Sequence, residues 1–508
     1  MQSAAIFRDP RLLGAFATPR RNLSRRPKSV AESALITVAM RWTDRLIGFV
    51  STLILARLLV PEDFGVIAMA SLVIGLADVF FELGVNVALI QNKTPSQEHY
   101  DTAWTLRIIQ TTLAATLVVI ASPWAAAYFN DPRVTLVVQV LAVSLVLSGL
   151  ENIGVVTFQK EMQFGREFQF LFCKRIVGFI VTIAAAWFIR SYWALVMGAL
   201  AGRTFGVALS FAMHPMRPRL SLKKFGEIFS VSQWMLVRSI GGYFQLKLHL
   251  AIVGARESAS VLGAYSLASE ISALPSSELL APINRVLFPA FVRVKHDLVE
   301  LKRLVLLAQG VQTMIAMPAA IGLILVSSEA VLLLLGEKWM GAVPFVEIFA
   351  LISFLSSIAT SGSYVLLTLG KMRLMAISSW VQVGLFATLA LVIFPDAGAM
   401  GIARLYLVVV TLGLIALMVF LLRHLEGLRF GEIVSSMSRP LIAVAVMALC
   451  VIFITRTTSL DGWWLLAAKI LVGASAYVMS ILALWLISGR RSGAESYLLE
   501  KAMRWRKR

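Results

Sequence analysis

The sequence predicts an all-α polytopic integral membrane protein with about 14 transmembrane helices, and three observations support this. The chain has 508 residues, of which 58% are hydrophobic and only 15% are charged. Its mean hydropathy is +0.81, whereas a soluble chain is about 45–50% apolar and roughly a quarter charged. Apolar runs long enough to cross a bilayer, about 20 residues each, recur along the whole chain with short loops between them. A soluble enzyme is therefore excluded.

Each predicted span is an apolar run bounded by charged or turn-forming residues. In chain order the runs lie at 34–60, 64–90, 103–128, 134–158, 170–190, 192–214, 226–254, 261–290, 304–328, 343–369, 374–394, 398–422, 440–457 and 463–487.

The distribution of positive charge predicts the orientation. The chain carries 47 Lys and Arg against 28 Asp and Glu, a formal charge of +19. Most of these cations fall in the tails and in the loops of one side when the N-terminus is cytoplasmic. By the positive-inside rule we expect both termini to be cytoplasmic. The basic tails then bind anionic lipid, and nucleic acid is not an expected partner. The opposite loops keep only Arg133, Arg190, Arg256, Lys338 and Arg456.

The sequence lacks the motifs of catalysis and of cofactor binding. Its five histidines have no metal-ligand spacing, and it has no HExxH, Walker, GxGxxG or GxSxG motif. No hydrophilic segment between spans is long enough to fold as a catalytic domain. We therefore expect no enzyme, no metal and no cofactor.

An internal sequence repeat relates the two halves of the chain. Residues 64–71 (FGVIAMAS) reappear as 262–269 (LGAYSLAS), offset by 198 positions, and each copy opens a span after a short external turn. Helix residues at equal steps from a turn lie at equal depth, so charges in these hairpins can be matched across the turn. Four pairs of opposite charge match in this way: Arg41 with Glu82, Arg45 with Asp78, Arg238 with Glu278, and Lys247 with Glu270.

These matched charges have two interpretations. A charge inside a bilayer costs about 2.5–3.5 kcal/mol even on insertion scales, so it faces the bundle or a wet cavity. In the first interpretation the pairs are structural clamps between helices. In the second they line a cavity, where the cations bind an anionic substrate and the acidic residues couple transport to an ion. Arg41, Arg45 and Arg238 lie about 20–30 Å from the external turn, in the cytoplasmic half. Arg107, Arg203 and Arg404 are further candidates.

The eighth span has the composition of a gating helix. It carries Pro275, Pro282 and Pro289, spaced by seven residues, and proline removes a helix hydrogen bond and bends the helix. We expect a kinked or broken helix in which Pro275 and Pro282 take part in gating. The alternative is that Pro289 ends the helix.

The opening hairpin resembles that of Wzx-like polysaccharide transporters. The resemblance is carried by residues 48–70 (GFVSTLILARLLVPEDFGVIAMA), 82–91 (ELGVNVALIQ), 101–104 (DTAW) and the turn 335–344 (LGEKWMGAVP). It runs along most of the chain and is closest to the WzxC-type branch of the multidrug, oligosaccharidyl-lipid and polysaccharide exporter superfamily. The basic N-terminal tail is longer than is usual in that family.

The resemblance implies two six-helix lobes around a cavity, with two further helices. The boundaries are then a tail at 1–33, lobes at 34–214 and 226–422, a linker at 215–225, spans 13 and 14 within 423–487, and a tail at 488–508. The implied function is to flip an undecaprenyl-pyrophosphate-linked oligosaccharide across the bacterial inner membrane, by alternating access, for exopolysaccharide or another surface polysaccharide. Membrane lipids are implied partners, and a polysaccharide polymerase and chain-length or export proteins are candidate ones.

Three other functions remain open at this level. A cation-coupled multidrug exporter and a peptidoglycan lipid flippase belong to the same superfamily. A membrane glycan polymerase or ligase belongs to another class and usually carries a long external loop, which this chain lacks. The glycan, the coupling ion and the oligomeric state are not encoded in any pattern we recognise.

Overall fold

The computed structural model describes residues 43, 46–81, 85–92, 94–229, 233–425 and 427–489. Within these ranges the chain is helical and contains no strand. The first half comprises a first helix described over Leu46–Leu58, α2 (Pro61–Phe81), α3 (Val85–Gln91), α4 (Gln97–Phe129), α5 (Arg133–Leu150), η2 (Ile153–Val155), α6 (Val156–Lys160), α7 (Phe164–Ile189), α8 (Trp193–Met213) and α9 (Phe225–Phe229).

The second half continues the same pattern of long helices and short connections. It comprises α10 (Gln233–Arg256), α11 (Ala259–Arg293), α12 (Leu298–Leu325), α13 (Ser327–Ala330), η3 (Val331–Leu335), η4 (Glu337–Ala342), α14 (Val343–Thr368), α15 (Met372–Thr388), η5 (Leu389–Ile393), α16 (Ala399–His424), α17 (Phe430–Thr457) and α18 (Gly462–Ile487).

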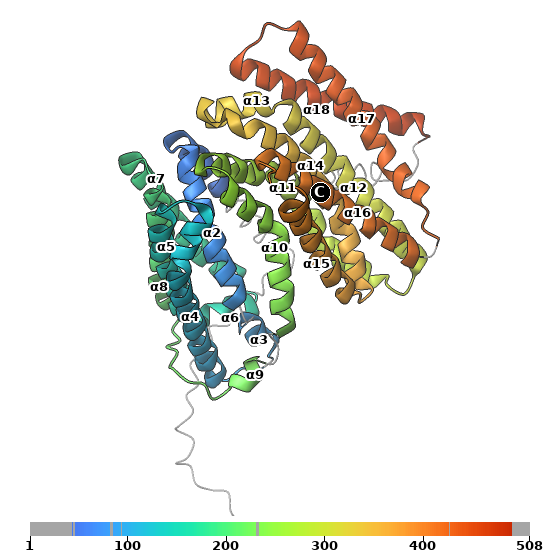
Figure 1. Cartoon of the computed structure of the whole chain (residues 1–508). Helices are drawn as coiled ribbons and strands as arrows, with labels where there is room; N and C mark the ends of the chain where they lie inside the picture. Colours follow the sequence, from blue (N-terminus) through green and yellow to red (C-terminus); the bar gives the residue numbers. More distant parts are fainter. Residues whose placement is uncertain are drawn as a thin grey trace, which may run out of the picture.

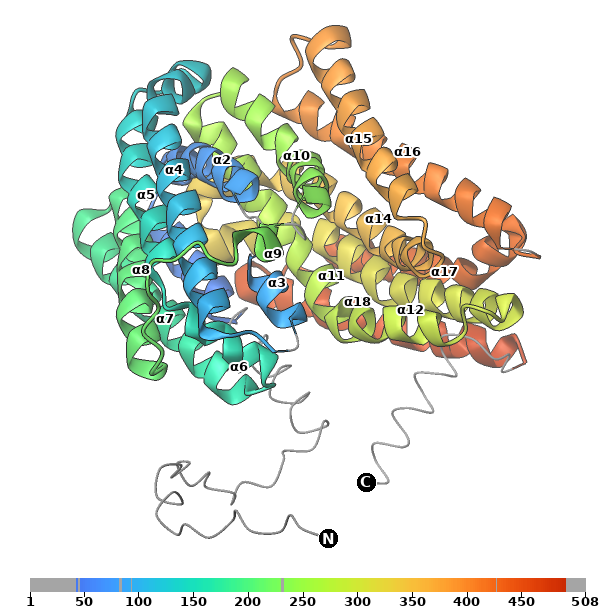
Figure 2. The same ribbon diagram turned by 90° about the horizontal axis from the view of Figure 1, so that it is seen from below.

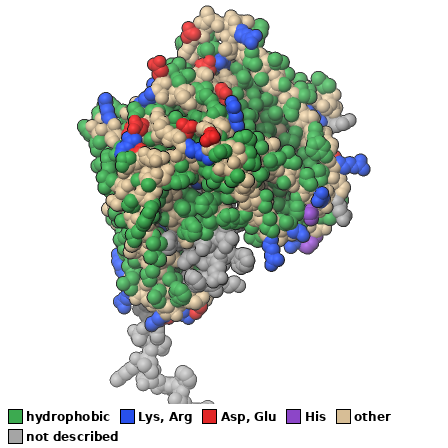
Figure 3. Space-filling model, viewed as in Figure 1, with side chains coloured by type: hydrophobic (Ala, Val, Ile, Leu, Met, Phe, Trp, Pro, Cys, Tyr) green, Lys and Arg blue, Asp and Glu red, His purple; other side chains and the backbone are tan. Residues whose placement is uncertain are grey.

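The predicted fold class is confirmed. In the described part of the chain, 11 helices are long and apolar enough to cross a membrane. The other three predicted spans fall on the first helix and on α10 and α11, which carry polar side chains along their length. Hydrophobic side chains cover most of the face seen in Figure 3, and charged ones gather in its upper part and at its lower edge. This is the surface of a multi-pass membrane protein.

Two boundaries differ from the prediction because a proline does not end its helix. α17 begins at Phe430 and carries Pro440 inside it, so the predicted start at 440 is ten residues late. α11 runs unbroken from Ala259 to Arg293 with all three prolines inside. Pro289 therefore does not end this helix, and the helix is not broken. A gating role for Pro275 and Pro282 stays a prediction.

The helices pack in two groups. In Figures 1 and 2, α4, α5, α7 and α8 lie on one side and α12, α14, α15 and α16 on the other, with α10 between them. α2 packs against α4 and α5 and also crosses to α11. We call α2, α4, α5, α7 and α8 the N-terminal group, and α11, α12, α14, α15 and α16 the C-terminal group. α17 and α18 pack on each other, and α17 packs along α12.

The two groups meet where α2 crosses α11, and the crossing uses the repeated glycine. A Cβ on Gly65 would lie 1.8 Å from the carbonyl oxygen of Ala259, and a Cβ on Gly263 would lie 1.8 Å from that of Pro61. These two contacts are related by the repeat offset of 198 residues. Only glycine allows backbones to approach so closely. We call this region, residues 61–65 with 259–263, the closed end.

Candidate functional site

The first helix, which leads into the closed end, is fixed to η3 and η4 by side chains that bond backbone carbonyls. The last carbonyls of a helix have no partner within it. At the end of the first helix they accept hydrogen bonds from Trp339 Nε1, at 2.8 Å on Ala56, and from Lys338 Nζ, at 2.9 Å on Arg57. In return, Arg57 Nε donates to the Leu334 carbonyl at 3.0 Å. Trp339 is fully buried, and its ring meets the ring of Phe64 in the closed end edge-on, with centroids 5.0 Å apart.

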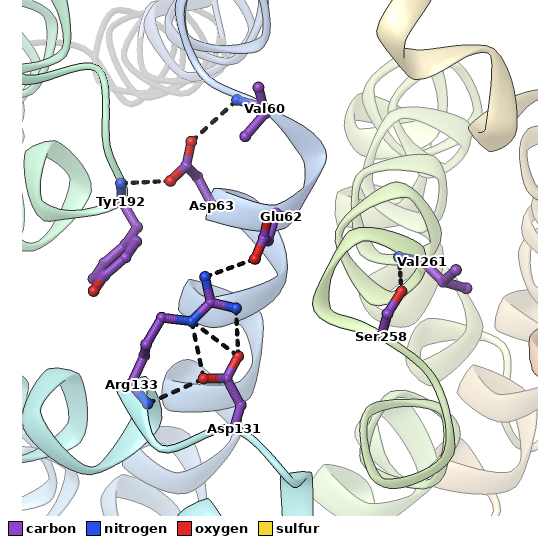
Figure 4. A network of polar contacts seen from close by, with 8 residues as sticks. All are labelled: Val60, Glu62, Asp63, Asp131, Arg133, Tyr192, Ser258 and Val261. Atoms are coloured by element: carbon purple, nitrogen blue, oxygen red, sulfur yellow. Dashed lines mark hydrogen bonds and ion pairs between the residues drawn. The ribbon is translucent and has the colours of Figure 1, made fainter.

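The same end is fixed to the N-terminal group by the ion network drawn in Figure 4. Arg133 bonds Asp131 at 2.7 Å and Glu62 at 2.7 Å. Hydrogen bonds from Arg133 hold the pKa of Asp131 below its usual range. Asp63 accepts from the backbone N–H of Tyr192 at 2.9 Å. The start of α2 is therefore tied to the starts of both α5 and α8.

Three connected cavities lie among the helices. A cavity of about 690 Å³ lies between the first helix, α2, α7, α8, α10 and α11. It shares Lys247, Ser266 and Glu270 with a second cavity of about 820 Å³, which α10, α11, α14 and α16 line. A third, of about 480 Å³, adjoins the second inside the C-terminal group. All three have the volume of small-molecule sites.

The first cavity is positively charged. Its described lining holds four cations and one carboxylate: Lys174, Arg175, Arg203, Lys247 and Glu270. Arg175 lies against the first helix, since its Nη2 atom would be 2.8 Å from a Cβ on Gly48. We call this space the cationic cavity. Guanidinium and ammonium groups facing a cavity can bind phosphate through charge-assisted hydrogen bonds.

A buried carboxylate supports the wall of the cationic cavity. Glu151, at the end of α5, is 5% exposed. Lys174 bonds one of its oxygens, and Arg107 lies 3.7 Å from the other. Two cations therefore share one carboxylate, and the local charge remains positive. The predicted candidate Arg107 is part of this network within the N-terminal group.

Two of the depth-matched residues reach the same cavity. Lys247 and Glu270 line both larger cavities, yet neither takes part in an ion pair within the part of the chain that the structure describes. Glu278 and Pro275 instead line an apolar groove of about 440 Å³ beside the first helix. Matching steps from a turn gives the height of a residue and not the face that it occupies, which is why Glu270 and Glu278 of α11 line different spaces.

Some of the remaining predicted residues lie in the described part of the chain and others lie outside it. Arg41, Arg45 and Glu82 lie outside the described residues, and so does the side chain of Arg238, whose backbone belongs to α10. Asp78 is an exposed residue of α2, and Pro282 is exposed on α11. Of the further candidates, Arg203 lines the cationic cavity, and Arg404 is exposed on α16 and lines none of the three cavities.

Sequence reasoning missed Lys174, Arg175 and Glu151. The two cations are adjacent in an apolar run. Because successive side chains of a helix point about 100° apart, Lys174 and Arg175 face different neighbours. One meets Glu151 and the other faces the first helix. The only signal in the sequence is a Lys-Arg pair inside the span at 170–190.

Comparison with known proteins gives consistent relatives. The family model described as "Polysaccharide biosynthesis protein" matches residues 54–344. The lipopolysaccharide biosynthesis protein WzxC of Escherichia coli is 24% identical over 78% of this chain and 81% of its own. The succinoglycan biosynthesis transport protein ExoT of Rhizobium meliloti is 23% identical over 80% of this chain and 82% of its own.

Solved structures share the fold. The lipid II flippase MurJ in an inward closed conformation superposes with a TM-score of 0.74 at 13% identity, over 89% of this chain and 99% of that chain. An inward-facing multidrug resistance MATE family transporter superposes with a TM-score of 0.56 at 14% identity, over 74% of this chain and 93% of that chain.

Proposed function

Because the chain belongs to the polysaccharide biosynthesis protein family, we propose that it flips lipid-linked oligosaccharide repeat units across the bacterial inner membrane by alternating access. The substrate is an undecaprenyl-pyrophosphate-linked glycan, used for exopolysaccharide or another surface polysaccharide. The relatives named for lipopolysaccharide and succinoglycan biosynthesis support this substrate class. The chain is a transporter and not an enzyme, and its lobes are residues 34–214 and 226–422, joined by the linker 215–225.

The cationic cavity is the observation that carries the proposal. A diphosphate entering the membrane needs fixed positive charge, because moving an anion into low dielectric is otherwise costly. Arg203 and Lys247 face that cavity and take part in no ion pair within the described part of the chain. In the proposal they bind the diphosphate together with Lys174, Arg175 and the predicted cations Arg41, Arg45 and Arg238.

The acidic residues balance these cations when the cavity is empty. Glu270 lies on the wall that both larger cavities share. In the proposal it offsets the charge of the cavity without an ion pair to Lys247, or it carries a coupling ion. The predicted acids Asp78, Glu82 and Glu278 are proposed to hold their depth-matched arginines or to carry a coupling ion. The excess of cations over carboxylates favours an anionic substrate over the cationic substrates of a multidrug exporter.

The closed end gives the direction of access. From the positive-inside pattern we infer that it lies on the periplasmic side, with both termini in the cytoplasm. The described structure is then closed toward the periplasm, which is the state that receives a substrate made in the cytoplasm. Separation of α2 from α11 releases the glycan on the other side.

The test is a gene deletion complemented with charge variants. Deletion should trap undecaprenyl-linked repeat units on the cytoplasmic leaflet. Arg203→Gln and Lys247→Gln should each lower export roughly 10- to 100-fold, since a hydrogen bond to a charged group is worth about 1.5–3 kcal/mol. Arg404→Gln is the matched control, because Arg404 is a helical arginine outside the cavities. Equal export by all three variants at equal abundance would reject the assignment.

A further inference from the structure

The third cavity has a different chemistry from the cationic cavity. It lies between α10, α14, α15 and α16 and measures about 480 Å³. Among the described residues that line it there is no charged side chain, and we call it the neutral cavity. Its polar lining consists of hydroxyl and amide groups: Gln245, Ser356, Thr360, Ser363, Tyr364, Ser378, Ser379, Gln382 and Tyr406.

The hydroxyl groups of α14 present acceptors to this cavity. Thr360 Oγ1 donates its proton to the Ser356 carbonyl at 3.0 Å, and Ser363 Oγ donates to the Ala359 carbonyl at 2.9 Å. A hydroxyl has one proton and two acceptor lone pairs. With the proton committed to the helix, each oxygen is left to accept hydrogen bonds. This wall therefore suits a ligand that donates from several hydroxyls.

The wall formed by α10 and α15 combines acceptors with donors. Gln245 Nε2 donates to Gln382 Oε1 at 3.1 Å, and Gln382 Nε2 donates to Ser378 Oγ at 3.2 Å. Each amide nitrogen has a second N–H, and each amide oxygen a second lone pair. The chain of bonds fixes both amides in place and leaves part of their capacity for a ligand.

Aromatic rings complete the lining. Tyr406 stacks on the buried His249, with ring centroids 4.3 Å apart, and Phe386 meets Tyr406 edge-on at 5.8 Å. A tyrosine offers an apolar ring and a polar tip. A sugar has the matching shape, because a pyranose ring carries C–H groups on its faces and hydroxyls around its edge.

We propose that the neutral cavity binds uncharged sugar residues of the transported glycan, an inference that rests on the proposed function. Leu246, Ser356, Thr360, Tyr364 and Tyr406 line it and the 820 Å³ cavity alike. That second cavity joins the cationic cavity at Lys247 and Glu270. One ligand can therefore place its diphosphate against the cations and its sugars in the neutral cavity.

Other ligand classes fit this cavity poorly. A polyprenyl tail would leave the free lone pairs of the hydroxyls and the second N–H groups of the amides without partners while displacing the water that otherwise meets them, which is costly. A cation would find no carboxylate among the described lining residues, and an anion would find no cation. A neutral molecule rich in hydroxyls satisfies the lining and requires no buried charge.

Binding to the full-length protein in lipid nanodiscs tests the proposal. The probes are undecaprenyl pyrophosphate, the same lipid carrying glucose, and the same lipid carrying glucuronic acid. The glucose lipid should bind more tightly than the bare lipid, and the glucuronic acid lipid should lose that advantage. Thr360→Val and Gln382→Leu should each reduce the added affinity for glucose roughly 3- to 10-fold, with binding of the bare lipid unchanged.

Two further variants separate loss of a contact from loss of structure. Thr411→Val is the matched control, because Thr411 makes the same bond to the carbonyl four residues earlier, at 2.8 Å, and lines none of the three cavities. It should keep the full glucose effect, and Thr360→Ser should restore it. Equal binding of all three lipids, or an equal loss in Thr411→Val, would overturn the proposal. Failure of even the bare lipid to bind would instead refute the diphosphate site and with it the proposed function.

Discussion

Adding one methyl group at the closed end should open it. In Gly263→Ala the new Cβ would lie 1.8 Å from the Pro61 carbonyl oxygen, and ordinary contact begins at 3.4 Å. The two backbones must therefore part by about 1.6 Å. Both partners are helix backbone, so no side chain can rotate away. Gly65→Ala repeats the same clash on Ala259.

The size of the effect follows from the cost of overpacking, about 1–3 kcal/mol. The clash exists only while α2 and α11 are in contact, so this cost falls on the closed state. The ratio of opened to closed molecules should rise about 5- to 150-fold. Export should fall, because the state that receives the substrate becomes less populated.

The assay is labelling of Ser266→Cys by an impermeant maleimide added to intact cells, in a Cys173→Ser/Cys450→Ser background. Ser266 lines both larger cavities and lies one turn beyond Gly263. Labelling should accelerate in both glycine variants. Gly322→Ala is the control without contact, since no atom lies within 4 Å of its added Cβ. In Gly254→Ala the added Cβ meets only movable side chains, at 3.0 Å or more. Its labelling rate should lie between those of Gly322→Ala and Gly263→Ala. Wild-type labelling and export in Gly263→Ala would refute the reasoning.

Three other predictions concern two ion pairs and the prolines of α11. Lys469 of α18 is 5% exposed and bonds Glu329 at 2.6 Å, so Lys469→Met should destabilise the purified protein by about 3 kcal/mol. The loss should show as a lower melting temperature, and Lys469→Met/Glu329→Gln should recover part of it. The lowered pKa of Asp131 means that its pair with Arg133 stabilises the fold above the usual carboxyl pKa and is lost as the pH falls through the lowered value. The melting temperature, measured at a series of pH values, should therefore fall in acid, and this fall should be smaller in Asp131→Asn. Pro275→Ala/Pro282→Ala should lower export at normal abundance if the α11 prolines serve gating, and unchanged polymer output would assign them a packing role.

The spans could be predicted because bilayer thickness sets their length, and in the described part of the chain the long apolar runs lie on helices. Two predicted runs extend too far: 64–90 covers both α2 and α3, and 134–158 continues past the end of α5 at Leu150. Positions within the spans were harder. Depth matching brought Lys247 and Glu270 to one cavity but gave no pair between them. The contacts at Trp339 and Lys338 were not predictable, because they join side chains to carbonyls some 280 residues away. No pattern in one chain specifies such a distant backbone partner.

The repeat explains both what the two halves share and what separates them. The repeated octapeptides supply one glycine each to the same crossing, so the backbone geometry of the closed end is nearly symmetric. The cavity walls are not: α7 and α8 contribute Lys174, Arg175 and Arg203, whereas α14 and α15 contribute hydroxyls and an amide. In the proposed transport cycle the two halves separate at this nearly symmetric contact, and the unequal walls orient one ligand with its charged end toward the N-terminal group. Exchanging the chemistry of the two walls should therefore impair transport even where the closed end and the abundance of the protein are unchanged.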